Sequence, residues 1–188
     1  KVSSTIIIWS FTPVPTATII PAIAAISKLN FASAAIPNVM KISEIQIIRT
    51  GITVLIFLYL KNISKDTDYV VMLDGDNTYK AKEIPRMIEP LESNFADVII
   101  GSRLEGRMNG NSMSFSHRAA NWFFTFFVRH FYFANITDTC SGFFAWKRKA
   151  IEKLNGYIKS EGFAIEAEMI TKMAKMNYRI FSVPITYD

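Results

Sequence analysis

The segment YVVMLDGDNTY, residues 69–79, is an apolar run that ends in two acids held one residue apart. Such a run is typical of a buried parallel strand, and ligands of open α/β sheets bind beyond the carboxyl ends of these strands. Residues i and i+2 of an extended segment point the same way, so Asp74 and Asp76 share one side, while Gly75 lets other atoms approach the backbone. With Thr78 nearby, these oxygens suit Mg²⁺ or Mn²⁺. The alternative is an ordinary polar turn after a strand.

The segments that follow this strand alternate between helical and extended patterns. We expect an amphipathic helix at 80–94 that breaks near Pro90, and a buried strand at 96–103 in which Gly101 begins a loop. We then expect an aromatic helix, a strand or loop that feeds a helix capped by Gly156, another helix and a closing strand, at 117–133, 140–156, 164–177 and 178–187. This alternation predicts an α/β fold with a mixed, mostly parallel sheet flanked by helices.

The first third of the chain differs in composition from the rest. Of the 16 acids, Glu44 is the only one within residues 1–65. The uncharged stretch 5–26 is long enough to span a membrane, but three prolines interrupt it and its β-branched residues weaken a helix. Three interpretations stay open for this segment: membrane-embedded, ordinary strands and loops, or a stretch that is not native to the protein.

Regular apolar spacing begins near residue 43. In 43–62 the large apolar residues recur at near-helical intervals, which predicts a buried helix ahead of the strand at residue 69. We therefore divide the chain into an atypical hydrophobic segment, 1–46, and a recognisable domain, 47–188.

Composition narrows the partners. The 188 residues are 50% hydrophobic and carry a formal charge of +5, which favours anionic partners such as phosphates, nucleotides or acidic lipid head groups. No nucleic-acid motif or block of basic residues occurs, so we expect no nucleic-acid partner. One cysteine, Cys140, excludes an intramolecular disulfide, and two histidines are too few for a histidine-built metal site. Any bound metal must therefore be held by carboxylates.

Two arginines are candidates for phosphate contacts. Arg103 follows a buried strand and should lie at the ligand edge of the sheet, where its guanidinium fork suits phosphate; the alternative is a structural ion pair. Arg118 stands at the start of the aromatic helix, where the helix N-terminus would help it to meet a phosphate. The aromatic side chains of that helix either pack in the core or face a membrane. Arg107, His117 and His130 are expected to be ordinary polar positions.

Five motifs in register carry a family resemblance. From about residue 47 to 187, the chain resembles the family 2 glycosyltransferases, specifically the dolichyl- or polyprenyl-phosphate sugar synthases such as dolichol-phosphate mannosyltransferase. The resemblance implies a glycosyltransferase A-type fold. The motifs are DYVVMLDGDNTY, ADVIIGSRLEG, DTCSGFFAWKRKAI, GFAIEAEM and RIFSVPITY.

The resemblance implies a metal-dependent, inverting transfer of a sugar from a GDP- or UDP-linked donor to a dolichyl or polyprenyl phosphate, at the cytoplasmic face of a membrane. The acceptor phosphate is already anionic, so positioning and charge neutralisation would supply most of the rate. The catalytic residues implied are Asp76, Arg103 and Arg118, and the metal ligands are Asp74, Asp76 and Thr78. Donor binding falls to Asp74, Gly75, Asp76, Asp138, Ser141 and Gly142.

Several of these roles have alternatives. Asp138 orients either a sugar hydroxyl or an arginine, and Ser141 and Gly142 permit close approach to the donor or form only a tight turn. Cys140 is expected to be incidental. Glu166 and Glu168 face about 200° apart on a helix, so only one can point at the site, and we expect it to be Glu168.

The sequence also departs from the family pattern. Neither the opening strand with its P-x-x-N-E turn nor the second strand with its D-x-S-type end is recognisable, and the chain stops at VPITYD, where we expect a C-terminal truncation. The alternatives are therefore a family 2 enzyme with a polysaccharide or other lipid acceptor, or a non-catalytic remnant without half of the nucleotide pocket. A nucleotidyltransferase would need a glycine-rich basic loop near its N-terminus, which this sequence lacks.

Overall fold

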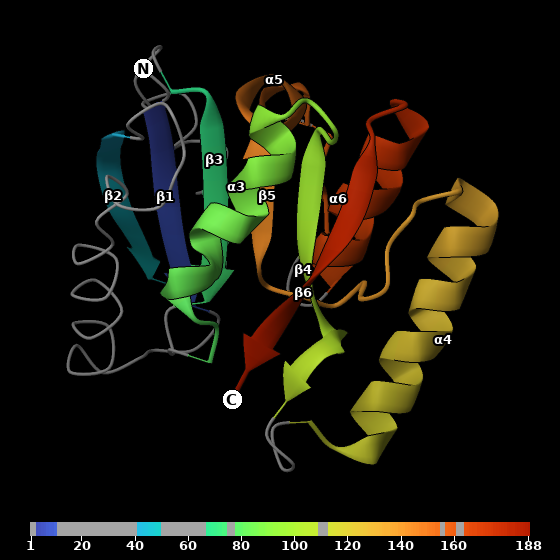
Figure 1. Cartoon of the computed structure of the whole chain (residues 1–188). Helices are drawn as coiled ribbons and strands as arrows, with labels where there is room; N and C mark the ends of the chain where they lie inside the picture. Colours follow the sequence, from blue (N-terminus) through green and yellow to red (C-terminus); the bar gives the residue numbers. More distant parts are fainter. Residues whose placement is uncertain are drawn as a thin grey trace.

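The structure is a computed structural model that describes residues 3–10, 41–49, 67–74, 78–108, 113–154, 157–160 and 164–188. Its described residues form a six-stranded sheet in the order β2-β1-β3-β5-β4-β6 (Figure 1). The strands are β1 (Ser3–Ser10), β2 (Lys41–Arg49), β3 (Tyr69–Asp74), β4 (Val98–Met108), β5 (Phe144–Lys147) and β6 (Ile180–Tyr187). The helices are η1 (Ala81–Glu83, a 3₁₀ turn), α3 (Ile84–Glu92), α4 (Phe115–Tyr132), α5 (Arg148–Lys153) and α6 (Ala164–Lys175).

The sheet is mixed and mostly parallel, as predicted. Strand β1 pairs in parallel with β2 and β3, and β4 pairs in parallel with β6. Only β5, among the described strands, runs antiparallel to both of its neighbours. The parallel strands therefore end at one edge of the sheet, which is the lower edge in Figure 1. Asp74 is the last residue of β3 and lies at that edge.

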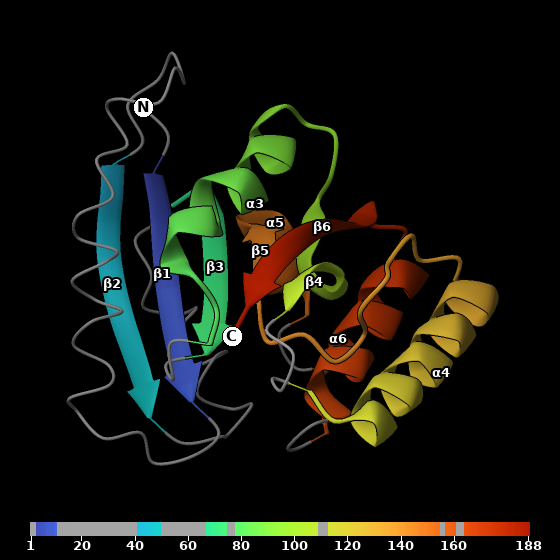
Figure 2. The same cartoon turned by 60° about the horizontal axis from the view of Figure 1, so that its bottom comes forward.

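The core lies on both faces of the sheet. Val70 and Met72 of β3 pack on the face that carries α5 and α6, whereas Val71 and Leu73 pack on the face that carries α3. The turned view of Figure 2 shows α3 on one side of the sheet and α6 on the other. Burial on both faces is the reason that the strand reads as a continuous apolar run.

The N-terminal third contributes two strands that the sequence did not reveal. Strand β1 lies beside β3 in register, with Ile6 opposite Val71, and β2 lies beside β1. The predicted helix at 43–62 is wrong as far as Arg49, because residues 41–49 form β2. β-branched residues fit a pleated sheet, and the near-helical spacing of the isoleucines was misleading. The rest of that predicted helix lies outside the described residues, and the division at 46/47, which falls inside β2, stays a prediction.

Gly101 does not begin a loop, so that prediction is wrong. Strand β4 runs through it to Met108, and its N–H donates to the Phe143 carbonyl oxygen over 2.8 Å. A β-carbon at this position would lie 2.8 Å from Cδ1 of Ile185. The glycine therefore serves the close packing of β4 against its neighbours rather than a turn.

The prediction that this helix breaks near Pro90 is wrong, because α3 continues through Pro90 to Glu92. A proline removes one helical hydrogen bond and crowds the carbonyl of residue i−4, yet α3 keeps Pro90 inside its last turn. The Pro90 carbonyl oxygen then accepts from the backbone N–H groups of Phe95 and Ala96, both at 3.0 Å. These bonds close the helix end.

The remaining predicted elements are confirmed by α4, β5, α5, α6 and β6. The predicted helix cap at Gly156 lies outside the described residues.

Candidate active site

Asp74 is pressed against the loop that precedes β5. A β-carbon on Gly142 would lie 2.5 Å from Oδ2 of Asp74 and 2.9 Å from its Cγ. Only glycine leaves room for the carboxylate here, so the close approach at Gly142 is that of Asp74, and the predicted approach of the donor stays a prediction. Thr78 lies just beyond β3, while Gly75 and Asp76 lie outside the described residues.

The same loop is fixed by two further hydrogen bonds. The Gly142 N–H donates to the hydroxyl oxygen of Tyr79 over 2.8 Å, and the Phe143 N–H donates to Oγ of Ser141 over 3.2 Å. Tyr79 and Ser141 are both buried. Ser141 therefore shapes the turn with its side chain, and its predicted role in donor binding stays a prediction.

Arg103 and Asp138 form a buried ion pair at this edge. Nε of Arg103 donates to Oδ2 of Asp138 over 2.8 Å, and an Nη2 N–H donates to Oδ1 over 2.9 Å. The backbone N–H of Arg103 also donates to Oδ2, over 2.9 Å. Burial alone would lower the pKa of Arg103, but the hydrogen bonds and charge of Asp138 outweigh it and raise the pKa. Of the two roles weighed for Asp138, the structure shows it orienting an arginine.

This pair is linked to helix α4. Nδ2 of Asn121 donates to Oδ1 of Asp138 over 2.7 Å, and the Thr125 hydroxyl lies 2.9 Å from that of Thr139. The Thr139 N–H also donates to the Thr125 hydroxyl, over 3.1 Å. The two α4 residues are buried, one helical turn apart, and are tied to the loop that follows the helix. Helix α4 is therefore held to the site by polar bonds.

Arg118 lies one turn before Asn121 on the same side of α4, because residues three apart share a helix face. It is exposed, in the first turns of a helix capped by the Ser114 side chain. Helix N-termini attract anions. The structure thus shows Arg118 exposed in the second turn of α4, one turn before the residue that reaches Asp138, and its role in catalysis stays a prediction.

Glu166 is the acid that the sequence prediction missed. It is 3% exposed in the first turn of α6, and its charge interacts with those of Asp74 and Arg103. Burial raises the pKa of Glu166 to about 8, and the negative charge of Asp74 adds to the effect. The expectation that Glu168 faces the site is wrong, since its carboxylate accepts from the backbone N–H groups of Lys159 and Ser160 and pairs with Lys172.

The charges at this edge favour a bound cation. Burial raises the pKa of both Tyr79 and Glu166, and the negative charge of Asp74 adds to both shifts, so Asp74 contributes a negative potential at this edge. All donors are oxygen atoms, which suits Mg²⁺ or Mn²⁺. Among the residues that the structure describes, no three acids, histidines or cysteines cluster tightly enough to hold an ion. Asp74 therefore fits as one ligand, and the predicted ligands Asp76 and Thr78 stay predictions.

Cys140 and the two histidines are not candidates for catalytic residues of this site. Burial, with the charge of Asp138, raises the pKa of the Cys140 thiol to about 11, so the thiol is neutral and unreactive near pH 7. His117 and His130 are exposed on α4, and His130 stacks on Phe126.

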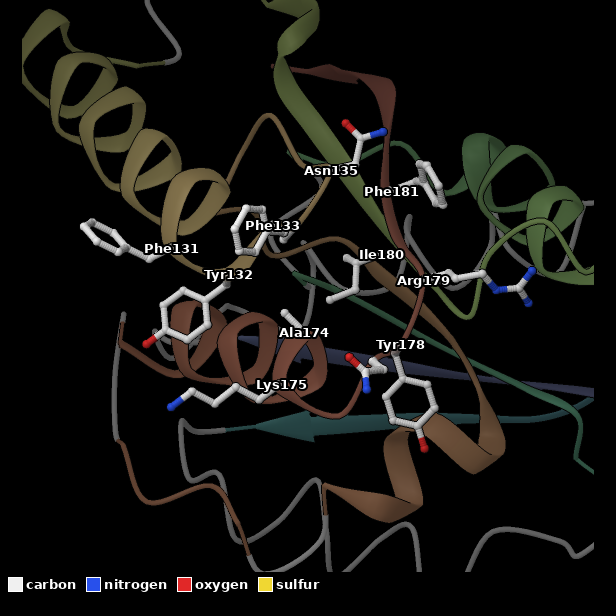
Figure 3. Close-up of a pocket in the computed structure, with 12 residues that line it drawn as sticks. Phe131, Tyr132, Phe133, Asn135, Ala174, Lys175, Tyr178, Arg179, Ile180 and Phe181 are labelled. Carbon is white, nitrogen blue, oxygen red and sulfur yellow. The ribbon is translucent and has the colours of Figure 1, made fainter.

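The surface also has cavities away from this edge. One of about 510 Å³ lies where α4 and α6 end and β6 begins, and Figure 3 shows Tyr132, Lys175 and Tyr178 around it. It opens at the amino end of β6, opposite the edge that carries Asp74. Another, of about 610 Å³, lies between Leu104 of β4 and the aromatic side chains of α4.

Helix α4 exposes most of its aromatic side chains. Phe115 is 87% exposed and Trp122 is 64% exposed, so of the two interpretations of these aromatics, core packing is wrong for most of them. In the described parts of the chain, no helix is both long and apolar enough to cross a membrane. The other large exposed aromatics of α4 are Phe123, Phe124, Phe126, Phe127 and Phe131.

Comparison with known proteins identifies the family. Residues 61–155 match the family model "Glycosyl transferase family 2", which covers β3, the Arg103–Asp138 pair and α4. The chain belongs to glycosyltransferase family 2, and the resemblance inferred from its motifs is confirmed.

Two similar proteins illustrate the relationship. The low-salt glycan biosynthesis hexosyltransferase Agl6 of Haloferax volcanii is 36% identical over 64% of this chain and 29% of its own length. The undecaprenyl-phosphate mannosyltransferase of Micrococcus luteus is 27% identical over 66% of this chain and 51% of its own. The chain thus spans about half, or less, of the length of these relatives.

A solved structure supports the fold. Glucosyl-3-phosphoglycerate synthase of Mycobacterium tuberculosis, in complex with Mn²⁺, UDP-glucose and phosphoglyceric acid, superposes with a TM-score of 0.64 at 12% identity, over 98% of this chain and 71% of that one. The predicted glycosyltransferase A-type fold is confirmed, and it includes β1 and β2.

Proposed function

We propose that this protein transfers a sugar from a nucleotide-sugar to a dolichyl or polyprenyl phosphate, with inversion. The observation that carries the proposal is that Asp74, at the carboxyl end of β3 in a family 2 glycosyltransferase sheet, packs against Gly142 of the same loop whose Asp138 holds Arg103. One relative acts on undecaprenyl phosphate by its name, which favours a lipid-phosphate acceptor.

The donor would bind at the end of β3. Asp74, with Asp76 and Thr78 as further proposed ligands, would hold Mg²⁺ or Mn²⁺, which when bound supplies neutralisation of the leaving diphosphate. Structures of the mycobacterial synthase contain Mn²⁺ and UDP-glucose, which supports a UDP-linked donor here, with a GDP-linked donor as the alternative. Gly75, Ser141 and Gly142 would line the path of the donor.

The acceptor phosphate would bind on the α4 side. Arg103 is held by Asp138 with its guanidinium plane fixed, and Arg118 supplies a second, exposed cation. A phosphate oxygen placed between them would attack the anomeric carbon of the donor, and no base is needed because the phosphate is already anionic. Fixing the direction of attack and neutralising charge are the contributions of these two side chains.

Helix α4 would rest on the membrane that holds the acceptor. Its exposed aromatics and the exposed Arg118 and Arg129 suit the head-group region of anionic lipid. The 610 Å³ groove beside Trp122 and Phe126 offers room for the first isoprene units. We propose that the protein works on the cytoplasmic face of a membrane.

A transfer assay tests the proposal. The protein is given Mn²⁺, radiolabelled UDP- or GDP-sugar and undecaprenyl phosphate in mixed micelles, and labelled lipid is extracted. We expect metal-dependent transfer that Asp74→Asn abolishes and Asp97→Asn, a carboxylate on the opposite edge, leaves intact. Transfer only to a polysaccharide or a neutral lipid would replace the acceptor, and a folded protein that binds neither nucleotide would be a non-catalytic remnant.

A further inference from the structure

Glu166 has an unsatisfied oxygen in a buried place. Its side chain is 3% exposed, and Oε2 has no hydrogen-bond partner among the residues that the structure describes. Buried polar atoms are nearly always hydrogen-bonded, so an unsatisfied one at a site needs an explanation. The other buried residues of this helix, Ile165, Met169, Ile170 and Met173, are apolar core residues, and Glu166 is the exception among them.

Glu168, two positions along the same helix, is a carboxylate with a structural role, and its hydrogen-bond partners can be compared with those of Glu166. Its oxygens accept from two backbone N–H groups, at 2.9 Å and 2.7 Å, and it pairs with Lys172. Glu166 has one backbone hydrogen bond, from its own N–H in the first turn of the helix. That bond leaves Oε2 unsatisfied, and no ion pair within the described structure accounts for it.

The charged neighbours of Glu166 define the ligand it can take. It interacts with Asp74, at the proposed donor end, and with Arg103, at the proposed acceptor end. A carboxyl group does not attract phosphate, but it binds hydroxyl groups well. In the proposed reaction, the group that lies between the donor diphosphate and the acceptor phosphate is the transferred sugar.

We propose that Glu166 hydrogen-bonds a hydroxyl group of the transferred sugar and so determines which sugar the site accepts. This inference rests on the proposed function, because it requires a nucleotide-sugar bound at Asp74. It adds a specificity residue to that site, on the helix from which the sequence had predicted Glu168 instead.

Calorimetry on matched variants tests the inference. UDP, GDP, UDP-glucose and GDP-mannose are titrated with Mn²⁺ into the wild type, Glu166→Ala, Glu166→Gln and the control Glu168→Gln. We expect unchanged affinity for the nucleoside diphosphates in both Glu166 variants, at least a tenfold loss of affinity for the preferred nucleotide-sugar in Glu166→Ala, and no such loss in the control. A monodeoxy donor that lacks the contacted hydroxyl should lose the same factor on the wild type and nothing further on Glu166→Ala.

The outcomes separate this inference from the proposed function. If the wild type binds a nucleotide-sugar but both Glu166 variants bind it equally well, Glu166 does not contact the sugar. If the variants lose the nucleoside diphosphate as well, Glu166 serves the metal or the nucleotide, and the inference is also overturned. If the folded wild type binds no nucleotide at all, the proposed function fails first. Thermal unfolding of each variant shows that the samples are folded.

Discussion

Replacing Asp138 with asparagine should destabilise the protein strongly, because it breaks a buried ion pair without changing its shape. Oδ1 of Asp138 accepts from Nη2 of Arg103 and Nδ2 of Asn121, and Oδ2 accepts from Nε and the backbone N–H of Arg103. An asparagine amide must put its NH₂ group where one oxygen stood. In either orientation, the NH₂ group of the asparagine then points at two or more N–H donors and leaves their hydrogen bonds unmade.

The magnitude follows from these lost bonds. Two charge-assisted hydrogen bonds at roughly 1.5–3 kcal/mol each, or the usual cost of breaking a buried pair, give a loss of about 3–5 kcal/mol. The Arg103 side chain is 10% exposed and that of Asp138 is 0% exposed, so water cannot replace the lost partner. Urea unfolding monitored by circular dichroism should show a lower midpoint with an unchanged slope.

The chain contains a matched control for this experiment. Asp97 accepts from the backbone N–H, Nε and Nη2 of Arg179 in the same pattern, each at 3.1 Å. The Arg179 side chain is 47% exposed, so solvent compensates for a broken bond. Asp97→Asn should therefore cost much less than Asp138→Asn. Equal losses in the two variants would refute the argument that burial, rather than bonding pattern, sets the contribution of the Arg103 pair.

Three further predictions concern the site and helix α4. Gly142→Ala places a β-carbon 2.5 Å from Oδ2 of Asp74, so the carboxylate must move. Mn²⁺-dependent nucleotide binding, measured by calorimetry, should therefore weaken at least tenfold. Unchanged binding would show that Asp74 is not a metal ligand. Glu166 holds its proton in the folded state to a pKa of about 8 but loses it near 4.5 when unfolded, so its contribution to the stability of the wild type should fall as pH rises from 4.5 to 8. Glu166→Gln does not titrate, and its advantage in urea unfolding should grow across that window to about 3 kcal/mol at pH 7; a constant difference would contradict it. The double variant Trp122→Ser, Phe126→Ser should lose co-sedimentation with anionic vesicles while keeping its unfolding temperature, because both side chains are exposed; retained binding would assign the membrane contact elsewhere.

The sequence predicted the elements whose signal is local. Strand β3 was recognisable because burial on both faces makes it continuously apolar, and its position before two acids indicated the ligand edge of the sheet. Strand β2 was missed because its isoleucines fit a helical spacing as well as a strand, and only pairing with β1 decides between them. The pairing of β2 with β1 cannot be predicted from the order of apolar and polar residues along the chain.

The site residues show the same limit. Arg103 and Asp138 are 35 positions apart, and only the fold brings them into contact. The choice between Glu166 and Glu168 depended on the rotation of α6, which the sequence leaves open because apolar residues flank both acids. The apolar stripe of residues 165, 169, 170 and 173 encloses position 166 and excludes 168, and it is the structure that shows this stripe to be the buried one.

The polar bonds between α4 and the site connect the two halves of the proposed reaction. The aromatic residues of α4 face outward, so Asn121 and Thr125 provide much of its inward attachment, and both reach the loop of Asp138 and Thr139. The same carboxylate of Asp138 fixes Arg103. If α4 rests on a lipid surface as proposed, the depth of the helix would set the height of the Arg103 guanidinium above that surface. For an acceptor whose phosphate is held at the head-group level, the distance from the membrane to the reacting atom would then depend on the buried carboxylate of Asp138, which links α4 to Arg103.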